Sequence, residues 1–114
     1  MGVNIIGGSI SLLRVSGEID VSNVSELQSA IERALIESPD GFIIDLSDVS
    51  YVDSAGVAAI MFAYRRLYPP GRLALVVANE QVKGILTLIH IERLPGIHVC
   101  DDSTEAEQAL STSI

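Results

Sequence analysis

The first apolar positions of the chain follow a pattern that is typical of paired strands. Val3–Ile6 and Ser9–Val15 are apolar runs, and Gly7-Gly8 lies between them. Two glycines between such runs favour a hairpin with a two-residue turn, because that turn needs positive φ angles. We expect the second strand to continue to Ile19.

A helical period replaces this pattern after residue 20. Apolar side chains recur there at three- and four-residue intervals and predict an amphipathic helix: Val24, Leu27, Ile31, Ala34 and Leu35. Asn23 and Glu26 have the spacing of a capping box at its start, and Pro39 lies just beyond its end. The first third of the chain is therefore expected to form a strand hairpin followed by one helix.

The middle of the chain alternates between strand and helix patterns. Phe42–Leu46 and Leu73–Ala78 are almost wholly apolar, which is typical of strands that are buried on both faces. Between them, Ala55–Leu67 predicts a helix that is apolar nearly all round. Arg65 and Arg66 lie in its last turn, where cations suit the helix dipole.

Three more elements complete the predicted fold. Asn79 is expected to cap a helix over Glu80–Ile89, and its inward side chains would be Val82, Ile85, Leu86 and Ile89. A strand over Ile97–Val99 and a terminal helix over Ser103–Leu110 follow. The order is β-β-α-β-α-β-α-β-α in one domain, residues 1–114. It predicts an α/β fold with a mixed, mostly parallel sheet covered by helices.

Composition narrows the classes of function. Lys and Arg number 7 and Asp and Glu number 15, so the net charge of −8 argues against nucleic acid or anionic membranes as partners. The longest uncharged segment beyond the N-terminal end, Ser54–Tyr64, is too short to span a bilayer. The start of the chain has no basic signal-peptide region. We expect a cytoplasmic protein with no membrane partner, and a monomer at this size.

Catalytic motifs are scarce. The sequence has neither a GxxxxGK[ST] phosphate loop nor a GxGxxG fingerprint, and Cys100 is its single cysteine. His90 and His98 have neither metal-ligand spacing nor a local acidic partner, so structural roles are the simpler interpretation for both. We expect no enzyme activity, no metal and no cofactor.

One polar segment, Asp53-Ser54-Ala55-Gly56, lies at the entrance of the apolar helix. Taken alone, the tetrapeptide is most simply interpreted as an N-cap supplied by Asp53 or Ser54. A second interpretation is that Ser54 is a modifiable hydroxyl. The free N–H groups and positive potential of a helix N-terminus would hold a phosphate there. The small residues Ala55 and Gly56 would leave the hydroxyl accessible.

Helical spacing from Ser54 predicts a surface strip. Steps of three and four residues lead to Ala58, Met61 and Arg65, with Phe62 beside them. The opposite face has the better core stripe: Val57, Ile60, Tyr64 and Leu67. We therefore expect an exposed, partly apolar strip that could bind a partner protein.

Three short motifs, spaced along the chain, resemble those of a known family. Asp45-Leu46-Ser47 is followed by Asp53-Ser54-Ala55-Gly56, and Ser16-Gly17-Glu18-Ile19-Asp20 precedes both. On these residues the chain resembles a STAS domain of the bacterial anti-sigma-factor antagonist type over almost its whole length. It departs from that family at His90, where a glycine is common near the end of the third helix.

The resemblance implies a regulatory switch. In that family the unmodified antagonist binds an anti-sigma factor, which is also a serine kinase of the GHKL type, and so frees the sigma factor. The kinase phosphorylates the serine at the helix entrance, here Ser54, and the antagonist is released; a PP2C-type phosphatase restores it. Asp20 and Asp53 would be the carboxylates that shape the site. The expected partner-binding residues are Asp20, Asp53, Ser54, Ala55, Gly56, Ala58, Met61, Phe62 and Arg65.

Two other functions stay open. A STAS domain can also be a regulatory subunit of another assembly, such as a stress-signalling complex or a lipid transporter, and the fold does not separate these roles. A small hydrolase with Ser54 as nucleophile belongs to a different class, but the sequence offers no credible base for it. A kinase-type anti-sigma factor that is encoded beside the chain, or co-purifies with it, would favour the antagonist.

Overall fold

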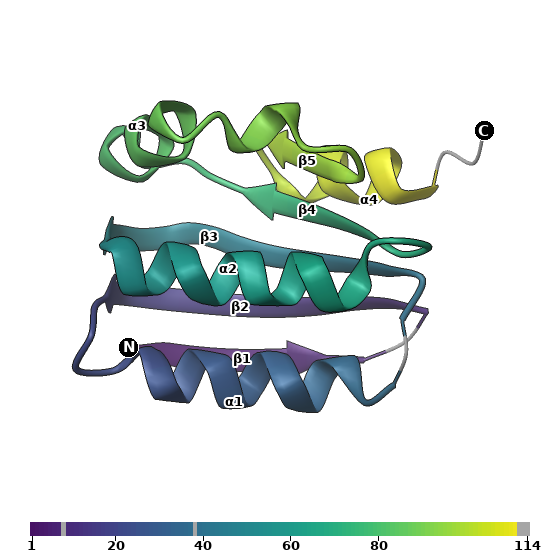
Figure 1. Cartoon of the computed structure of the whole chain (residues 1–114), viewed down its shortest axis with the longest axis horizontal. Coiled ribbons are helices and arrows are strands. Elements are labelled where there is room, and N and C mark those ends of the chain that lie inside the picture. The colour runs from purple at the N-terminus through teal and green to yellow at the C-terminus, as the bar shows by residue number, and fades with distance from the viewer. Residues whose placement is uncertain (8, 38, 112–114) are drawn as a thin grey trace.

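Five strands form one mixed sheet in the computed structural model, which describes residues 1–7, 9–37 and 39–111. In their order across the sheet the strands are β1 (Gly2–Ile6), β2 (Ile10–Ile19), β3 (Gly41–Val52), β4 (Arg72–Val76) and β5 (Ile97–Cys100). The helices are α1 (Val24–Leu35), α2 (Ser54–Leu67), α3 (Glu80–Leu88) and α4 (Ser103–Ser111), with a short 3-10 turn, η1 (Ile91–Arg93), after α3. This order confirms the predicted α/β fold class (Figure 1).

The hairpin at the start of the chain differs from the prediction in its turn. β1 pairs antiparallel with β2, and the other neighbouring strands are parallel. The ladder ends at the pair Ile6 and Leu12, whereas a two-residue turn would pair Ile6 with Ser9. The hairpin is confirmed and the two-residue turn is wrong. Gly8, on which that turn was placed, lies outside the described residues.

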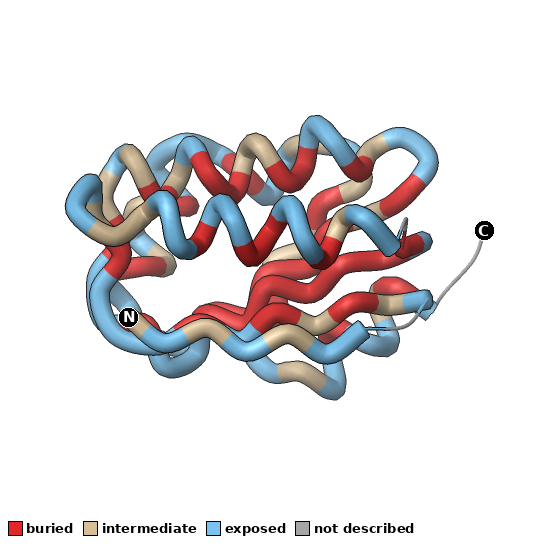
Figure 2. Tube along the Cα trace, turned by 90° about the horizontal axis from the view of Figure 1, so that it is seen from below, coloured by how far each residue is buried: buried red, intermediate tan, exposed pale blue. Residues whose placement is uncertain are grey.

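Helices cover the sheet on both faces. α1, α2 and α3 pack on one face, and α4 packs on the other. Side chains of β3 alternate between the two layers, so that Ile44 and Leu46 join the three-helix side and Ile43 faces α4. Residues 41–46 of β3 and almost all of β4 are therefore buried on both faces, as their apolar runs predict. Figure 2 shows the buried strands lying beneath the helix layer.

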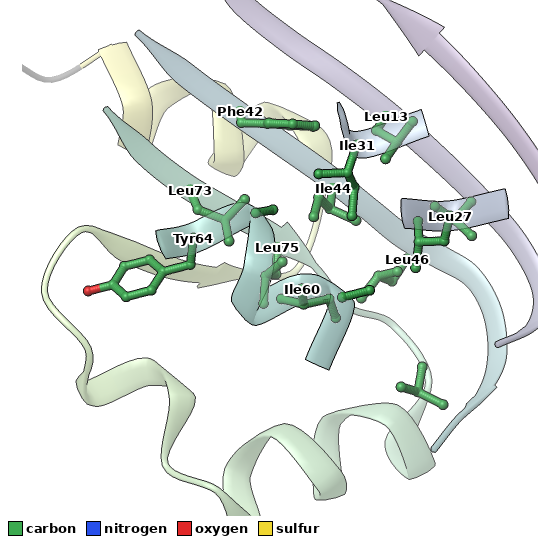
Figure 3. Close-up of a cluster of buried hydrophobic side chains, with 14 of the residues drawn as sticks. Leu13, Leu27, Ile31, Phe42, Ile44, Leu46, Ile60, Tyr64, Leu73 and Leu75 are labelled. Atoms are coloured by element: carbon green, nitrogen blue, oxygen red, sulfur yellow. The ribbon is translucent and has the colours of Figure 1, made fainter. Parts of the chain in front are cut away.

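The main core lies between the sheet and the first two helices. Figure 3 shows side chains of α1 and α2 meeting those of the strands, among them Leu27, Ile31 and Ile60. Burying each such aliphatic side chain stabilises the fold by about 1.5–3 kcal/mol. Tyr64 keeps its ring in this core while its hydroxyl donates a hydrogen bond of 2.5 Å to the Pro95 carbonyl. An aromatic core residue thus satisfies its polar end.

The start of α3 agrees with the sequence prediction, and its end does not. At the start, the Asn79 side chain accepts hydrogen bonds from the N–H groups of Gln81 (2.8 Å) and Val82 (3.1 Å), which confirms the predicted cap. At the far end the helix ends at Leu88, one residue before the predicted boundary. Ile89 is consequently 44% exposed, so its predicted inward position is wrong.

The residue after α3 has an unusual backbone for its type. His90 has φ 56° and ψ 40°, in the left-handed region that glycine adopts at much lower cost. Its N–H donates to the Thr87 carbonyl, so the conformation closes the end of the helix. A histidine here retains the turn but carries the steric cost of its Cβ.

α2 approaches the ends of β2 and β3 closely because Gly56 has no side chain. A Cβ at this position would lie 2.8 Å from Val52 Cγ1 and 2.9 Å from Ile19 Cγ2, inside contact distance. Gly56 is buried, so its small size serves this packing. Ser54 is exposed, as expected, but the small size of Gly56 serves the packing against Ile19 and Val52.

Replacing His90 with glycine should stabilise the protein. His90→Gly removes the left-handed steric cost and should raise the free energy of unfolding by roughly 0.5–1 kcal/mol, after the greater chain entropy of glycine is subtracted. Urea denaturation followed by far-ultraviolet circular dichroism measures this change. His90→Ala is the control, because alanine keeps a Cβ and should give no such gain. A His90→Gly protein less stable than the parent would contradict this account.

Two glycines in helices should respond to alanine with opposite signs. Gly56→Ala should lower the free energy of unfolding by about 1–3 kcal/mol, because the new methyl group overpacks against Ile19 and Val52. Gly84 in α3 is the matched control, since a Cβ there meets nothing within 4 Å. Gly84→Ala should raise stability by about 0.5–1 kcal/mol through helix propensity. Equal changes in the two variants, measured by thermal unfolding, would refute the tight packing at Gly56.

Candidate functional site

The start of α2 is capped by Asp53. Its Oδ1 accepts hydrogen bonds from the N–H groups of Ala55 (2.9 Å) and Gly56 (3.2 Å), and its backbone carbonyl accepts from the Val57 N–H (3.1 Å). Of the two capping candidates, Asp53 therefore performs this role. Ser54 is the first helical residue and is exposed. Among the described residues its hydroxyl has no hydrogen-bond partner, so capping does not consume it.

The same carboxylate also ties α2 to the loop after β2. Asp53 Oδ2 accepts from the Val21 N–H at 3.3 Å, and the Asp53 N–H donates to the Ile19 carbonyl at 3.1 Å. This loop, residues 20–23, is therefore held against the start of α2. The predicted neighbourhood of Asp20 and Asp53 follows from these bonds, which join segments 32 residues apart in sequence.

The loop itself is ordered by its own side chains. Asp20 accepts hydrogen bonds from both the hydroxyl and the N–H of Ser22, and together these hold the pKa of its carboxyl below the ordinary value of 3.8. Asn23 Oδ1 accepts from the Asp20 N–H at 3.0 Å, and its amide donates to the Glu18 carbonyl at 2.8 Å. Asn23 thus stabilises the loop and makes no side-chain bond to α1, so the predicted capping box is wrong.

The sequence pattern did not predict one exposed apolar side chain, that of Val21. Val21 is 78% exposed and lies on the loop that Asp53 holds beside Ser54. A single valine between Asp20 and Ser22 belongs to no periodic pattern, so the sequence carries no signal for it. The surface at the start of α2 therefore combines two carboxylates, a hydroxyl and an apolar side chain.

The predicted strip on α2 is only partly exposed. Ser54, Ala58 and Arg65 are exposed. Met61 and Phe62 are half-buried and pack against the main core, so the expected exposure is wrong at these two positions. The Arg66 guanidinium lies over the Phe62 ring, 5.4 Å from its centroid. The opposite side of α2 is buried and consists of Gly56, Ala59, Ile60, Ala63, Tyr64 and Leu67. Ala55, at the entrance, is half-buried.

Three N–H groups at the start of α2 are already occupied. Those of Ala55, Gly56 and Val57 all donate to oxygens of Asp53. These three N–H groups, which were expected to be free to hold a phosphate on Ser54, therefore already have acceptors. Such a phosphate would instead add negative charge beside an existing carboxylate.

His98, the histidine on β5, does not lie on the face of the sheet that carries α2 and Ser54. His98 lies on the same face of the sheet as Cys100, which packs with α4, whereas α2 covers the other face. Burial and the nearby Arg72 lower the pKa of His98. Among the described residues, no group of three or more His, Cys, Asp or Glu side chains could hold a metal ion. Nor is any helix in that part of the chain long and apolar enough to cross a bilayer.

Comparisons with known proteins agree with this architecture. The anti-sigma-F factor antagonist RsfB of Mycobacterium tuberculosis is 21% identical over 84 residues, which cover 74% of this chain and 69% of that protein. The crystal structure of an anti-sigma factor antagonist from Mycobacterium paratuberculosis superposes with a TM-score of 0.89 at 23% identity, covering 97% of this chain and 94% of its own. The Bacillus cell fate determinant SpoIIAA in its phosphorylated form gives a TM-score of 0.69 at 17% identity, covering 95% and 97% of the two chains.

The family itself is established by a match along the sequence. Residues 4–106 match the family model described as the STAS domain. That span includes all five strands in whole or in part, α1 to α3, and the segment that carries Asp53 and Ser54. The solved structures add that this arrangement of strands and helices is the fold of the SpoIIAA-like STAS proteins. The chain belongs to the STAS domain family.

Proposed function

We propose that this protein is an anti-sigma-factor antagonist whose binding surface surrounds Ser54 and is switched off by phosphorylation of that residue. The observation that carries the proposal is the exposed Ser54 hydroxyl at the first position of α2, where Asp53 performs the capping. Membership of the STAS family and the antagonist names of its relatives support the same function. The role is therefore one of binding, and it requires no catalysis by this chain.

The surface around Ser54 has the composition of a protein-binding site. Ala58 and Val21 present exposed apolar atoms near the start of α2, and Met61 adds a flexible, half-buried side chain. Arg65 places a positive charge at the far end of the strip. A partner could bury the small apolar patch while contacting Asp20 and Asp53 at its edge.

Electrostatics explains how a phosphate would release the partner. Phosphorylation adds about −1.5 to −2 charges at pH 7 to a surface that already carries Asp20 and Asp53. Repulsion from a partner carboxylate about 7 Å away amounts to roughly 4 kcal/mol at an effective dielectric constant near 20, before salt screening. Since about 1.4 kcal/mol is tenfold in affinity, a micromolar complex would dissociate without any refolding of the antagonist.

The enzymes of the proposed cycle are those that the resemblance to anti-sigma-factor antagonists implies. The anti-sigma factor would be a GHKL-type serine kinase that transfers the γ-phosphoryl group of ATP to Ser54 Oγ and releases ADP. A PP2C-type phosphatase would return Ser54 to the hydroxyl form by hydrolysis, with inorganic phosphate as the second product. Incubation with the kinase-type anti-sigma factors of the same genome and ATP, followed by mass spectrometry of the Ser54 peptide, identifies the kinase.

Substitutions at Ser54 should separate binding from modification. Ser54→Ala should bind the unmodified anti-sigma factor with parental affinity and resist phosphorylation, because it leaves the α2 strip intact. Ser54→Asp should weaken binding at least tenfold, since it adds a fixed negative charge. Ser25→Asp is the matched control, because Ser25 is an exposed serine in the first turn of α1. Equal affinities of Ser54→Ala and Ser54→Asp, measured by isothermal titration calorimetry, would exclude the phosphoserine switch.

A charge on the exposed strip should block the partner without unfolding the chain. Ala58→Glu should weaken binding at least tenfold and shift the melting temperature little, because Ala58 is exposed on α2. Thr104→Glu adds the same charge on α4, across the sheet, and should leave affinity unchanged. Parental binding by Ala58→Glu would place the interface elsewhere.

A further inference from the structure

The β1 border of the sheet is open. β1 pairs with β2 on one side, and as the first strand in the sheet order it has no neighbour on the other among the residues that the structure describes. Figure 2 looks onto this border and shows half-buried and exposed residues alternating along the strand, with α1 above it. Val3 and Ile5 are half-buried and pack against the main core, while Asn4 and Ile6 are exposed on the other face. The strand therefore presents unpaired backbone groups and incompletely covered apolar side chains.

β1 is short, but it lacks the other features that protect edge strands from pairing. Its sequence, Gly-Val-Asn-Ile-Ile, contains no charged residue and no proline, and its register with β2 runs without a bulge. The opposite border differs, since β5 is followed directly by Asp101 and Asp102. An unprotected border of this kind is suited to the addition of another strand.

α1 supplies a charged wall beside the open strand. A surface groove along this border is lined by Val3 of β1 and by four side chains of α1: Ser25, Glu26, Ser29 and Arg33. Glu26 and Arg33 are seven residues apart, two helical turns on one face, and have opposite charges. Ser29 lies between them and is small enough to allow another helix to approach. A two-fold rotation about a point between Glu26 and Arg33 places each of them opposite the other residue of the second copy. The pair is therefore self-complementary.

We propose that a second copy of this chain binds here, with β1 pairing antiparallel to β1 of the second copy. Such a pair would form one continuous sheet, and the two-fold axis perpendicular to it keeps both α1 helices on the same face. α1 packs over both β1 and β2, so the two α1 helices would be separated by about two strand spacings, roughly 9.6 Å. Helices in contact have interaxial distances of about 8–10 Å. The strands and the helices can therefore pair at the same time.

The register of the pair follows from its symmetry. An axis through Asn4 places Val3 opposite Ile5 of the second copy, so that the half-buried apolar side chains cover one another beneath the α1 helices. α1 runs alongside β1 in the same direction (Figure 1), so the same axis passes near the middle of α1. An axis midway between Ser29 and Ala30 brings Glu26 to Arg33 of the second copy, and this ion pair occurs twice.

The dimer and the Ser54 surface do not compete. α2 packs on the side of α1 that faces away from the β1 border, and Ser54 lies at the start of α2. Both copies would therefore present Ser54 to a partner. The proposal departs from the expectation of a monomer and does not rest on the antagonist function.

Charge reversal in a homodimer gives a specific test. Sedimentation equilibrium on the full chain, from micromolar to millimolar concentration, should show a rise from 12.2 kDa toward twice that mass. Glu26→Arg and Arg33→Glu should each raise the dimer dissociation constant about tenfold or more, because each places like charges opposite one another twice. An equimolar mixture of the two variants should dimerise again, since both pairs then join opposite charges. Glu32→Arg, an exposed α1 position outside the groove, is the control and should dimerise like the parent.

Each outcome of this test bears on the proposal. A mass of 12.2 kDa for the parent at every concentration would overturn it. A parent dimer that survives both single reversals, or a mixture that stays monomeric, would refute the pairing of Glu26 with Arg33. Amide hydrogen exchange gives an independent measurement, because the Val3–Ile6 amides should become more protected as the dimer forms. Unchanged protection of these amides in the dimer would exclude β1 from the interface.

Discussion

The candidate site depends on the carboxylate of Asp53, which accepts hydrogen bonds from two segments that lie far from each other in the sequence. One oxygen caps α2 through Ala55 and Gly56, and the other holds Val21 in the loop after β2. Hydrogen bonds to a charged group are stronger than those between neutral groups, so this bridge defines the position of both segments. The close contact of Gly56 with Ile19 and Val52 also fixes the start of α2 against β2 and β3. Ser54 is consequently presented from a rigid support.

This arrangement favours a switch based on charge over a phosphate-binding site. A free helix N-terminus stabilises an anion, but here the N–H groups of Ala55, Gly56 and Val57 already serve Asp53. A second anion at Ser54 therefore adds to the local negative charge. Asp20 is ionised at neutral pH, since its bonds to Ser22 lower the pKa of its carboxyl. The change that follows phosphorylation can remain on the surface, because the helix underneath is held by packing that the phosphate does not touch.

The carboxyl ends of the strands and the β1 border of the same sheet carry different chemistry. The carboxyl ends of β2 and β3 meet at the Ser54 surface, where carboxylates and small apolar side chains gather. The β1 border instead exposes backbone groups next to the charged pair Glu26 and Arg33. With a net charge of −8, any assembly of this chain with itself must overcome overall repulsion, which makes local complementarity the deciding factor. α1 separates the two surfaces, so each can act independently.

The sequence alone determined the elements, their order and their buried faces. The period of α2 predicted that Ala58 would be exposed and Ile60 buried, because both depend on side-chain chemistry repeated along one helix. Asn79 was recognisable as a cap because its partners lie two and three residues away. Patterns of this kind act over short distances in the chain, so the sequence displays them directly.

Only the tertiary structure decided which polar groups bind one another across the fold. Asn23 has the sequence position of a cap, yet it bonds to Asp20 and Glu18, because Asp53 holds that loop from 32 residues away. The hairpin turn after Ile6 was misjudged for a related reason, since its register depends on the whole ladder between β1 and β2. A polar side chain has several acceptors and donors within reach, and the packing of remote segments selects among them.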